Sequence, residues 1–148
     1  MKNLLLITSL FLAFNSCIYA TNLPKRTDNL STKQMEAQKE TITSMYAKEI
    51  SKTLPKQIDK YTKLLTVTAD SSTIIYTLEI NSGAKSDKAI QNEDKSRMQR
   101  AVTKGVCQTS KRFLDSNINI SYLYISAKSK VKLFRFDITK DKCLKLNR

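Results

Sequence analysis

The chain has 148 residues, of which 41% are hydrophobic, and 26 Lys and Arg against 13 Asp and Glu give it a formal charge of +13. This hydrophobic fraction favours a folded domain over disorder, and the presence of only two Gly and two Pro excludes collagen-like and low-complexity classes. A basic excess of this size is typical either of a protein with an anionic partner or of a soluble, Lys-rich surface.

Residues 1–20 have the pattern of a secretory signal peptide. Lys2 gives a positive start, an apolar stretch runs from Leu4 to Phe14, and small Ala20 precedes Thr21 at the expected cleavage point. The apolar stretch is shorter than a membrane-spanning helix requires, and no stop-transfer pattern follows it. We therefore expect export from a bacterial cytoplasm to the periplasm, with an outer-membrane lipoprotein or a secreted protein as alternatives.

Cys17 allows a second interpretation of the same segment. Residues 14–17 resemble a lipobox, in which a small residue precedes a Cys that becomes lipidated and forms the new N-terminus. Phe14 and Asn15 fit that motif poorly, so cleavage between Ala20 and Thr21 is favoured. Lipidation at Cys17 would tether the protein to a membrane, whereas the favoured cleavage leaves it free of one.

The mature chain is expected to contain a flexible lead-in over residues 21–30 and one domain over residues 31–148. A helix is predicted to begin at Ser31, because Gln34 completes a capping box and Leu30 and Met35 occupy the positions of a hydrophobic staple. It should end near Thr53, before Pro55. Its predicted core-facing stripe consists of Met35, Ile42, Met45, Tyr46, Ile50 and Leu54.

Two hairpins and a second helix complete the predicted elements. Strands are expected over residues 61–69 and 73–81, then a loop over residues 82–86 and a helix from Asp87 to about Arg112. Two further strands are expected over residues 117–127 and 129–139. Short links make antiparallel hairpins. The predicted fold class is therefore α+β, in two layers and α-β-β-α-β-β order, with two helices on a four-stranded antiparallel sheet.

Cys107 and Cys143 are expected to form a disulfide. They are the two cysteines of the chain outside the signal segment, and an even pair in an oxidising compartment favours a disulfide. Metal binding is the competing interpretation, but two thiols in a chain without histidine make a poor zinc site. We therefore predict one disulfide and no metal.

The residues give no sign of catalysis. The lack of His excludes Ser-His-Asp and Cys-His nucleophile systems, and the two glycines are isolated rather than part of a phosphate-binding loop. Paired carboxylates can hydrolyse glycosides, but Glu79, Glu93 and Asp94 are more simply explained as solvated surface residues. We expect no enzymatic activity, no catalytic residue and no cofactor.

A basic rim is predicted around the last hairpin. Aromatic residues alternate with cations there, which is a pattern that can bind single-stranded nucleic acid. However, the aromatic residues share the parity of the apolar core positions, so nucleic acid is not favoured as a partner. The rim would instead attract an acidic protein, and it consists of Lys128, Lys130, Lys132, Arg135, Lys140 and Lys142.

The layout resembles a group of small exported bacterial proteins. The resemblance rests on the signal, a helix ending at Leu54-Pro55, a hairpin, a helix ending near Cys107, the Phe113-Leu114 segment, a second hairpin and the closing Cys143. The group includes pilotins of type II secretion systems. The resemblance implies a disulfide, no enzymatic activity, and a lipoprotein that binds a secretin segment and brings it to the outer membrane.

Three functions follow as hypotheses. The first is a non-enzymatic periplasmic binding protein, an assembly factor for a secretion or pilus system, whose partner is an envelope secretion component. The second is a periplasmic inhibitor or immunity protein against a toxin or cell-wall hydrolase. The third is a secreted effector or surface ligand. A membrane is a partner only if Cys17 is lipidated.

Overall fold

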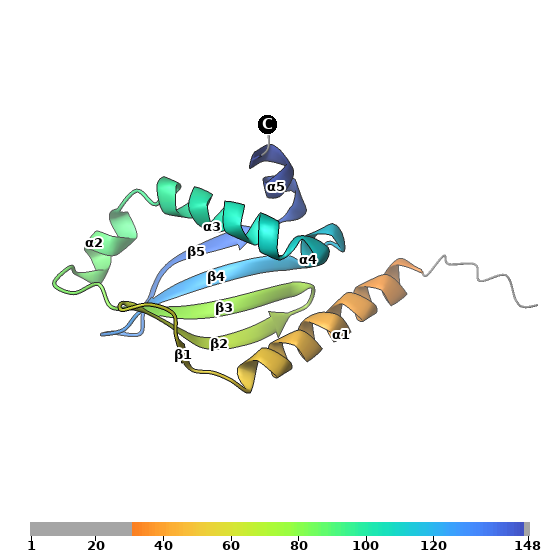
Figure 1. Ribbon diagram of the computed structural model, residues 1–148, viewed down its shortest axis with the longest axis horizontal. Helices are drawn as coiled ribbons and strands as arrows, with labels where there is room; N and C mark the ends of the chain where they lie inside the picture. Colours follow the sequence, from red (N-terminus) through yellow and green to blue (C-terminus); the bar gives the residue numbers. More distant parts are fainter. Residues whose placement is uncertain (1–30, 147–148) are drawn as a thin grey trace, which may run out of the picture.

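The computed structural model describes residues 31–146. The predictions that concern Cys17, Ala20, Thr21 and Leu30 lie outside the described residues. The helices are α1 (Thr32–Ser51), α2 (Asp87–Asn92), α3 (Ser96–Thr109), α4 (Lys111–Asp115) and α5 (Lys140–Leu146), and the strands are β1 (Lys56–Gln57), β2 (Thr62–Asp70), β3 (Thr73–Ile80), β4 (Asn119–Ser126) and β5 (Lys132–Ile138) (Figure 1). The described part of the chain is thus α+β, as predicted.

The sheet is five-stranded and mixed, which corrects the predicted four-stranded antiparallel sheet. Its strand order is β1-β2-β3-β4-β5, and the β2–β3 and β4–β5 hairpins are antiparallel as expected. β3 and β4, however, are parallel. The long connection between them returns the chain to the end of the sheet where β3 began, so β4 runs in the same direction as β3.

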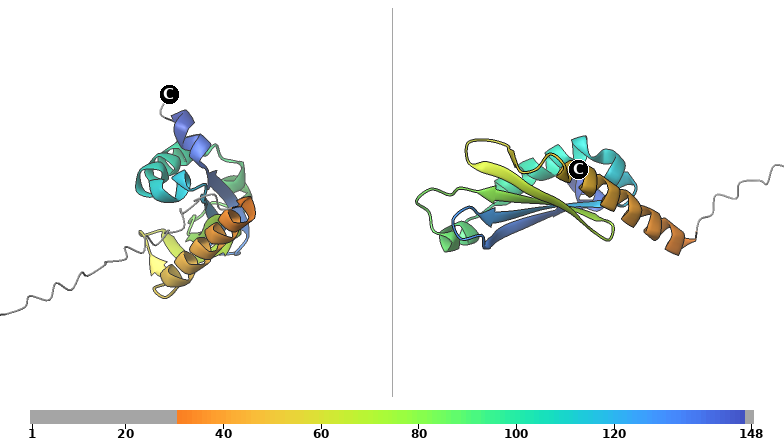
Figure 2. Two further views of the ribbon diagram at one scale, coloured as in Figure 1. Left: turned by 90° about the vertical axis from the view of Figure 1, so that its right-hand side faces the viewer. Right: turned by 90° about the horizontal axis from the view of Figure 1, so that it is seen from below.

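The core lies between the sheet and the helices. α1 and α3 both pack on the same face, as Figures 1 and 2 show. On that face Ile74 of β3 is beside Ile120 of β4, which is in turn paired with Ile138 of β5. All three isoleucine side chains are fully buried. Leu64, Tyr76 and Phe113 contact both the cluster under α1 and the cluster under α3, so the two clusters are continuous.

α1 begins as predicted, with the complete capping box. Ser31 Oγ accepts a hydrogen bond from the Gln34 amide at 3.3 Å, and Gln34 Oε1 accepts one from the Ser31 amide at 2.9 Å. The helix faces the sheet with Thr43 and Ala47. Thr43 can be buried because its hydroxyl donates to the carbonyl of Ser71, 2.7 Å away, and so leaves no polar atom unpaired.

The predicted core stripe of α1 is wrong in its first half. Tyr46, Ile50 and Leu54 do contact the core, but the side chains of Met35, Ile42 and Met45 are 43%, 40% and 67% exposed. The cause is visible in Figure 1, where the N-terminal half of α1 extends past the end of the sheet. Met35 lies in that N-terminal half. Ile42 and Met45 are close to Thr43 in the sequence, but successive residues are about 100° apart around a helix, so both lie on a different face from the buried Thr43.

The predicted second helix is divided into α2, α3 and α4, which is another correction. The break lies at residues 93–95, where Glu93 has an extended backbone. The Asp94 carboxylate accepts hydrogen bonds from the Ser96 amide at 2.8 Å and from the Ser96 hydroxyl at 3.0 Å, so it competes with helical pairing. The Lys95 ammonium donates to the carbonyls of Ile90 and Glu93 and thereby ends α2.

Cys107 of α3 and Cys143 of α5 form the predicted disulfide, which joins residues 36 positions apart. α5 was not predicted, and it has no buried side chain. The disulfide and the contact with α3 therefore hold α5 in place. None of the described helices combines the length and the apolar character that crossing a membrane requires.

Aromatic side chains fill the space between helices and sheet. Tyr76 stacks on Tyr122 with ring centroids 5.0 Å apart, and Tyr124 stacks on Phe134 at 4.5 Å. The hydroxyls of Tyr46 and Tyr76 share a hydrogen bond of 2.9 Å across the α1–sheet interface. These rings pack against the core, so they are not available to stack on nucleic-acid bases.

Stability should fall at alkaline pH because of these tyrosines. Burial raises the pKa of Tyr124 to about 12, and burial together with the hydrogen bond to Tyr46 raises the pKa of Tyr76 as well. A raised pKa in the folded state means that the stabilisation is complete below the unfolded value of about 10 and is lost as the pH rises towards the folded value. Urea unfolding at several pH values should show constant stability up to about pH 9 and a decline above pH 10.

The matched control for this prediction is Tyr124→Phe, which removes one of the titrating groups. The decline between about pH 10 and pH 12 should be shallower in this variant than in the wild type. A wild-type stability that stays flat, or rises, over this range would contradict the prediction.

Candidate binding groove

The six cations of the predicted basic rim separate into two groups at opposite ends of β5. Lys128 and Lys130 lie in the turn before β5, and Lys132 begins the strand, whereas Lys140 and Lys142 belong to α5 beyond its other end. The structure therefore does not bring the six together. Arg135 lies between the two groups.

Several of these cations already have partners. The Lys130 ammonium pairs with the Glu79 carboxylate across the sheet. Arg135 Nε donates to Asp137 Oδ1 at 2.6 Å, and its Nη2 donates to the Ser121 hydroxyl at 2.9 Å. Burial acts to raise the pKa of Asp137, but hydrogen bonds from Ser121 and Arg135 outweigh it and lower the pKa. This part of the predicted rim is a local structural network.

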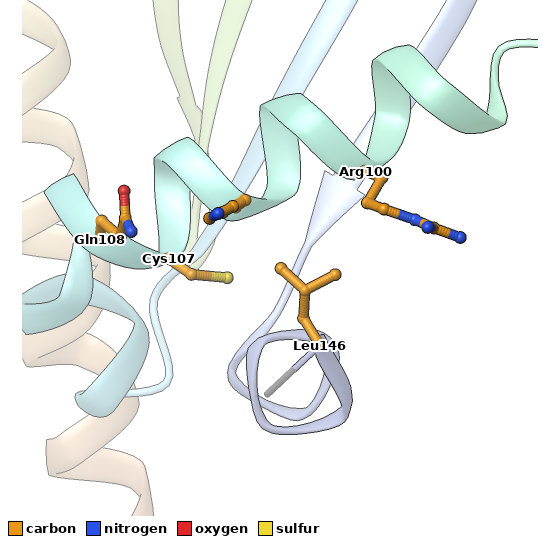
Figure 3. Close-up of a pocket in the computed structure, with 5 residues that line it drawn as sticks. Arg100, Cys107, Gln108 and Leu146 are labelled. Atoms are coloured by element: carbon orange, nitrogen blue, oxygen red, sulfur yellow. The ribbon is translucent and has the colours of Figure 1, made fainter. Parts of the chain in front are cut away.

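A groove lies between α3 and α5. A cavity of about 400 Å³ is lined by Arg100, Lys104, Cys107 and Gln108 of α3 and by Leu146 of α5. In Figure 3 the Leu146 side chain projects from α5 towards α3, and Cys107 projects from α3 towards α5. We call this space the α3–α5 groove.

The groove continues along α3 towards its N-terminus. A second cavity of about 280 Å³ shares Arg100 and Leu146 with the first. Its other lining residues are Ser96, Gln99 and Thr103 of α3 and Lys142 and Lys145 of α5. Cations thus line the groove on both helices, while Leu146 and the disulfide sulfur of Cys107 supply apolar surface.

The cations of the groove have few acidic neighbours. α3 contains Arg97, Arg100 and Lys104 and no Asp or Glu. Among the ion pairs of residues 31–146, none includes Arg100, Lys104 or Lys145. Asp141 is the one carboxylate within α5, and it does not line the groove. The groove is consequently a concave surface of positive charge.

The acidic residues considered as catalytic candidates do not gather at this groove. Glu79 pairs with Lys130, and Glu93 accepts a hydrogen bond from Lys85 at 2.6 Å. Asp94 accepts hydrogen bonds from the amide and hydroxyl of Ser96, the first residue of α3. Their hydrogen bonds lower the pKa values of Glu93 and Asp94. No group of three or more metal-ligating side chains occurs within the described residues. Each of these carboxylates has a structural role.

The sequence prediction included Lys142 but missed Arg100, Lys104 and Lys145. A signal was present, because Arg97, Arg100 and Lys104 are spaced three and four apart and so share one face of a helix. What the sequence did not reveal was α5, the second wall of the groove. Without that helix the cations of α3 look like an ordinary solvated face.

The chain belongs to a known protein family. Residues 34–134 match the family described as a domain of unknown function, DUF8479. That match includes α3 and ends before α5. Among proteins with curated descriptions, none matches significantly.

Three solved structures share the fold. A protein of Pseudomonas aeruginosa described as secreted has a TM-score of 0.66 and 14% identity, over 77% of this chain and 98% of its own. The pilotin EpsS of the Vibrio vulnificus type 2 secretion system has a TM-score of 0.62 and 14% identity, and the match covers 75% of this chain and 96% of EpsS. The type II secretion pilotin AspS of Vibrio cholerae has a TM-score of 0.59 and 17% identity, and the match covers 75% of this chain and 97% of AspS. The resemblance to pilotins expected from the sequence is confirmed for the fold.

Proposed function

We propose that this protein is an exported, non-enzymatic binding protein that acts as an assembly factor for an envelope machine, in the manner of a pilotin. The observation that carries the proposal is the fold, which two pilotins share over 75% of this chain. The predicted signal over residues 1–20 and the Cys107–Cys143 disulfide support export, because disulfides persist in oxidising compartments.

The chemistry of the groove supports binding rather than catalysis. Its walls present guanidinium, ammonium, amide and hydroxyl groups, and the whole chain lacks the His on which many general acid–base mechanisms depend. These groups can hold an anionic protein surface through charge and hydrogen bonds. The partner in this proposal is a protein component of a secretion or pilus system.

The form of the mature protein is part of the proposal. Cleavage before Thr21 would give a periplasmic protein that meets its partner by diffusion. Lipidation at Cys17 would instead place the domain on a membrane, where a segment of about 14 residues would precede α1 and could span up to about 45 Å when extended. In both forms the folded domain would face the periplasm.

Deletion of the gene tests the function. We expect the outer-membrane multimer of the secretin to be depleted from outer-membrane fractions and to be restored by the full-length gene. A copy lacking residues 1–20 is the control, because a protein retained in the cytoplasm should not restore the multimer. Normal multimers in the deletion strain would contradict the proposal. Greater sensitivity of that strain to a toxin or cell-wall hydrolase would then favour an inhibitor or immunity protein.

A further inference from the structure

We propose that the α3–α5 groove binds an acidic amphipathic helix of the partner, with the partner's carboxylates on the groove's cations and one of its apolar side chains on Leu146 and the disulfide. This inference rests on the proposed function, since it names the site and the chemistry by which a binding protein of this fold would hold its partner.

The first argument is charge. Arg100 and Lys104 line one cavity, and Lys145 lines the second cavity, which shares Arg100 and Leu146 with the first. None of the three belongs to an ion pair of residues 31–146, so like charges gather along the groove without a neutralising carboxylate. An anionic ligand would relieve the repulsion between these charges and gain charge-assisted hydrogen bonds.

The second argument is spacing. Arg100 and Lys104 are four residues apart on α3, so they follow each other along the helix by about 6 Å. Glu or Asp residues at positions i and i+4 of a partner helix have the same separation. A helix lying along the groove would therefore place its carboxylates in register with Arg100 and Lys104, while Lys145 approaches from α5.

The third argument is the apolar surface between the cations. Leu146 is half-buried and points towards α3, and Cys107 is half-buried on the facing wall (Figure 3). Both cysteines of the disulfide also line a smaller cavity of about 110 Å³, together with Leu114 and Leu144. A helix with an apolar stripe beside its acidic stripe would cover Leu146, as in other helix-in-groove complexes.

The shape of the site distinguishes a peptide from larger polyanions. A flat lipid surface or a nucleic-acid duplex would contact the outer rims of α3 and α5, whereas side chains of a peptide helix can enter the cavities between them. The protein also carries cations elsewhere, so general attraction to polyanions should not depend on the groove. This difference makes the inference testable with charge-matched variants.

The test measures binding of a synthetic peptide to the purified oxidised protein by fluorescence anisotropy. The probe is a peptide of about 18 residues, long enough for a partly formed helix, with Glu at i and i+4 and Leu on the adjoining stripe. Its control replaces every Glu with Gln. We expect the Glu peptide to bind with an affinity that falls as salt rises, and the Gln peptide to bind at least about tenfold more weakly.

Two triple variants then locate the site. R100E/K104E/K145E reverses three exposed charges in the groove. The control, K48E/K56E/K60E, reverses three exposed charges on α1 and around β1, which belong neither to the groove nor to the predicted basic rim. Both variants change the net charge equally. We expect the groove variant to bind the Glu peptide at least about tenfold more weakly than the control variant, which should stay near the wild type. R100Q/K104Q removes two of the charges without reversing them and should give an intermediate loss of affinity for the Glu peptide. Because this change is milder, the result also shows whether the loss in the triple variant reflects the lost charges rather than misfolding.

Three results would overturn the inference: equal losses in the two triple variants, no loss in the groove variant, or equal affinity for the Glu and Gln peptides. It would also be overturned if anionic phospholipid vesicles or duplex DNA bound more tightly than the peptide and lost that binding only in the groove variant. If the peptide binds through the groove but secretin multimers are normal in the deletion strain, the proposed function is contradicted and the groove assignment is supported. If the multimers are depleted in the deletion strain and the gene for the groove variant restores them, the proposed function is supported and the groove assignment is contradicted.

Discussion

Removal of the disulfide, by replacing both Cys107 and Cys143 with Ser, should lower the free energy of unfolding by roughly 3–4 kcal/mol. The bond closes a loop between residues 36 positions apart, so its loss restores much conformational freedom to the unfolded chain. Urea unfolding of the oxidised wild type and of C107S/C143S measures the difference. A loss of this size is a large fraction of the roughly 5–15 kcal/mol that stabilises a typical domain.

The same change should release α5 in the folded state. α5 has no buried side chain, and the disulfide is its one covalent link to α3. Amide hydrogens of residues 140–146 should therefore exchange much faster in C107S/C143S, while those of β4 stay protected. Reductant should reproduce the effect in the wild type and leave C107S/C143S unchanged. Equal stability of oxidised and reduced wild type would contradict the prediction.

Ile120→Ala should lower the free energy of unfolding by about 2–5 kcal/mol, which is the range for deleting most of a buried aliphatic side chain. Ile120 is 1% exposed, and β4 places it between Ile74 and Ile138 at the centre of the sheet. The rigid strands around it cannot close the cavity that the smaller side chain leaves. Chemical unfolding gives the free-energy difference, and the denaturant dependence should be unchanged.

Met45→Ala is the matched control for this prediction. Met45 is also apolar, and the sequence pattern placed it in the core, but its side chain is 67% exposed in the structure. Its truncation should change the free energy of unfolding by less than about 0.5 kcal/mol. Equal losses for Ile120→Ala and Met45→Ala would mean that α1 packs on the sheet with a different face.

The parts of the fold that local signals determine were predictable. The capping box of Ser31 and Gln34 marks the start of α1, because both reciprocal hydrogen bonds involve residues three apart. The alternation of Ile74, Tyr76 and Leu78 identifies β3 and its buried face. Cys107 and Cys143 could be paired because the chain has no other cysteine beyond residue 17.

The direction of β4 could not be predicted in this way. Alternating apolar residues identify the buried face of a strand and contain no information on its direction relative to a neighbour. The direction depends on how the chain crosses between Ile80 and Asn119, and residue periodicity predicts one helix where this crossing has three. Asp94 and Lys95 stop the helical run through side-chain hydrogen bonds that residue periodicity does not reveal.

The groove was beyond sequence prediction for a related reason. Arg100 and Lys104 are distant in sequence from Lys145 and Leu146, and the disulfide is what brings the two helices together. The seven residues of α5 include three lysines and bury no side chain, so the sequence shows no apolar stripe that would identify a helix there. Tertiary contacts, rather than the local sequence, define this site.

The central claim is that this chain is exported and that its disulfide is formed. The intact mass of the protein, purified from envelope fractions under non-reducing conditions, tests this claim most directly. The predicted mass is that of a chain beginning at Thr21 and lighter by the two thiol hydrogens of Cys107 and Cys143. A lipid-modified chain beginning at Cys17 in the membrane fraction would also confirm export and would select the tethered form. An unprocessed chain beginning at Met1 in the cytosol, with its thiols free, would contradict both export and the proposed role in the envelope.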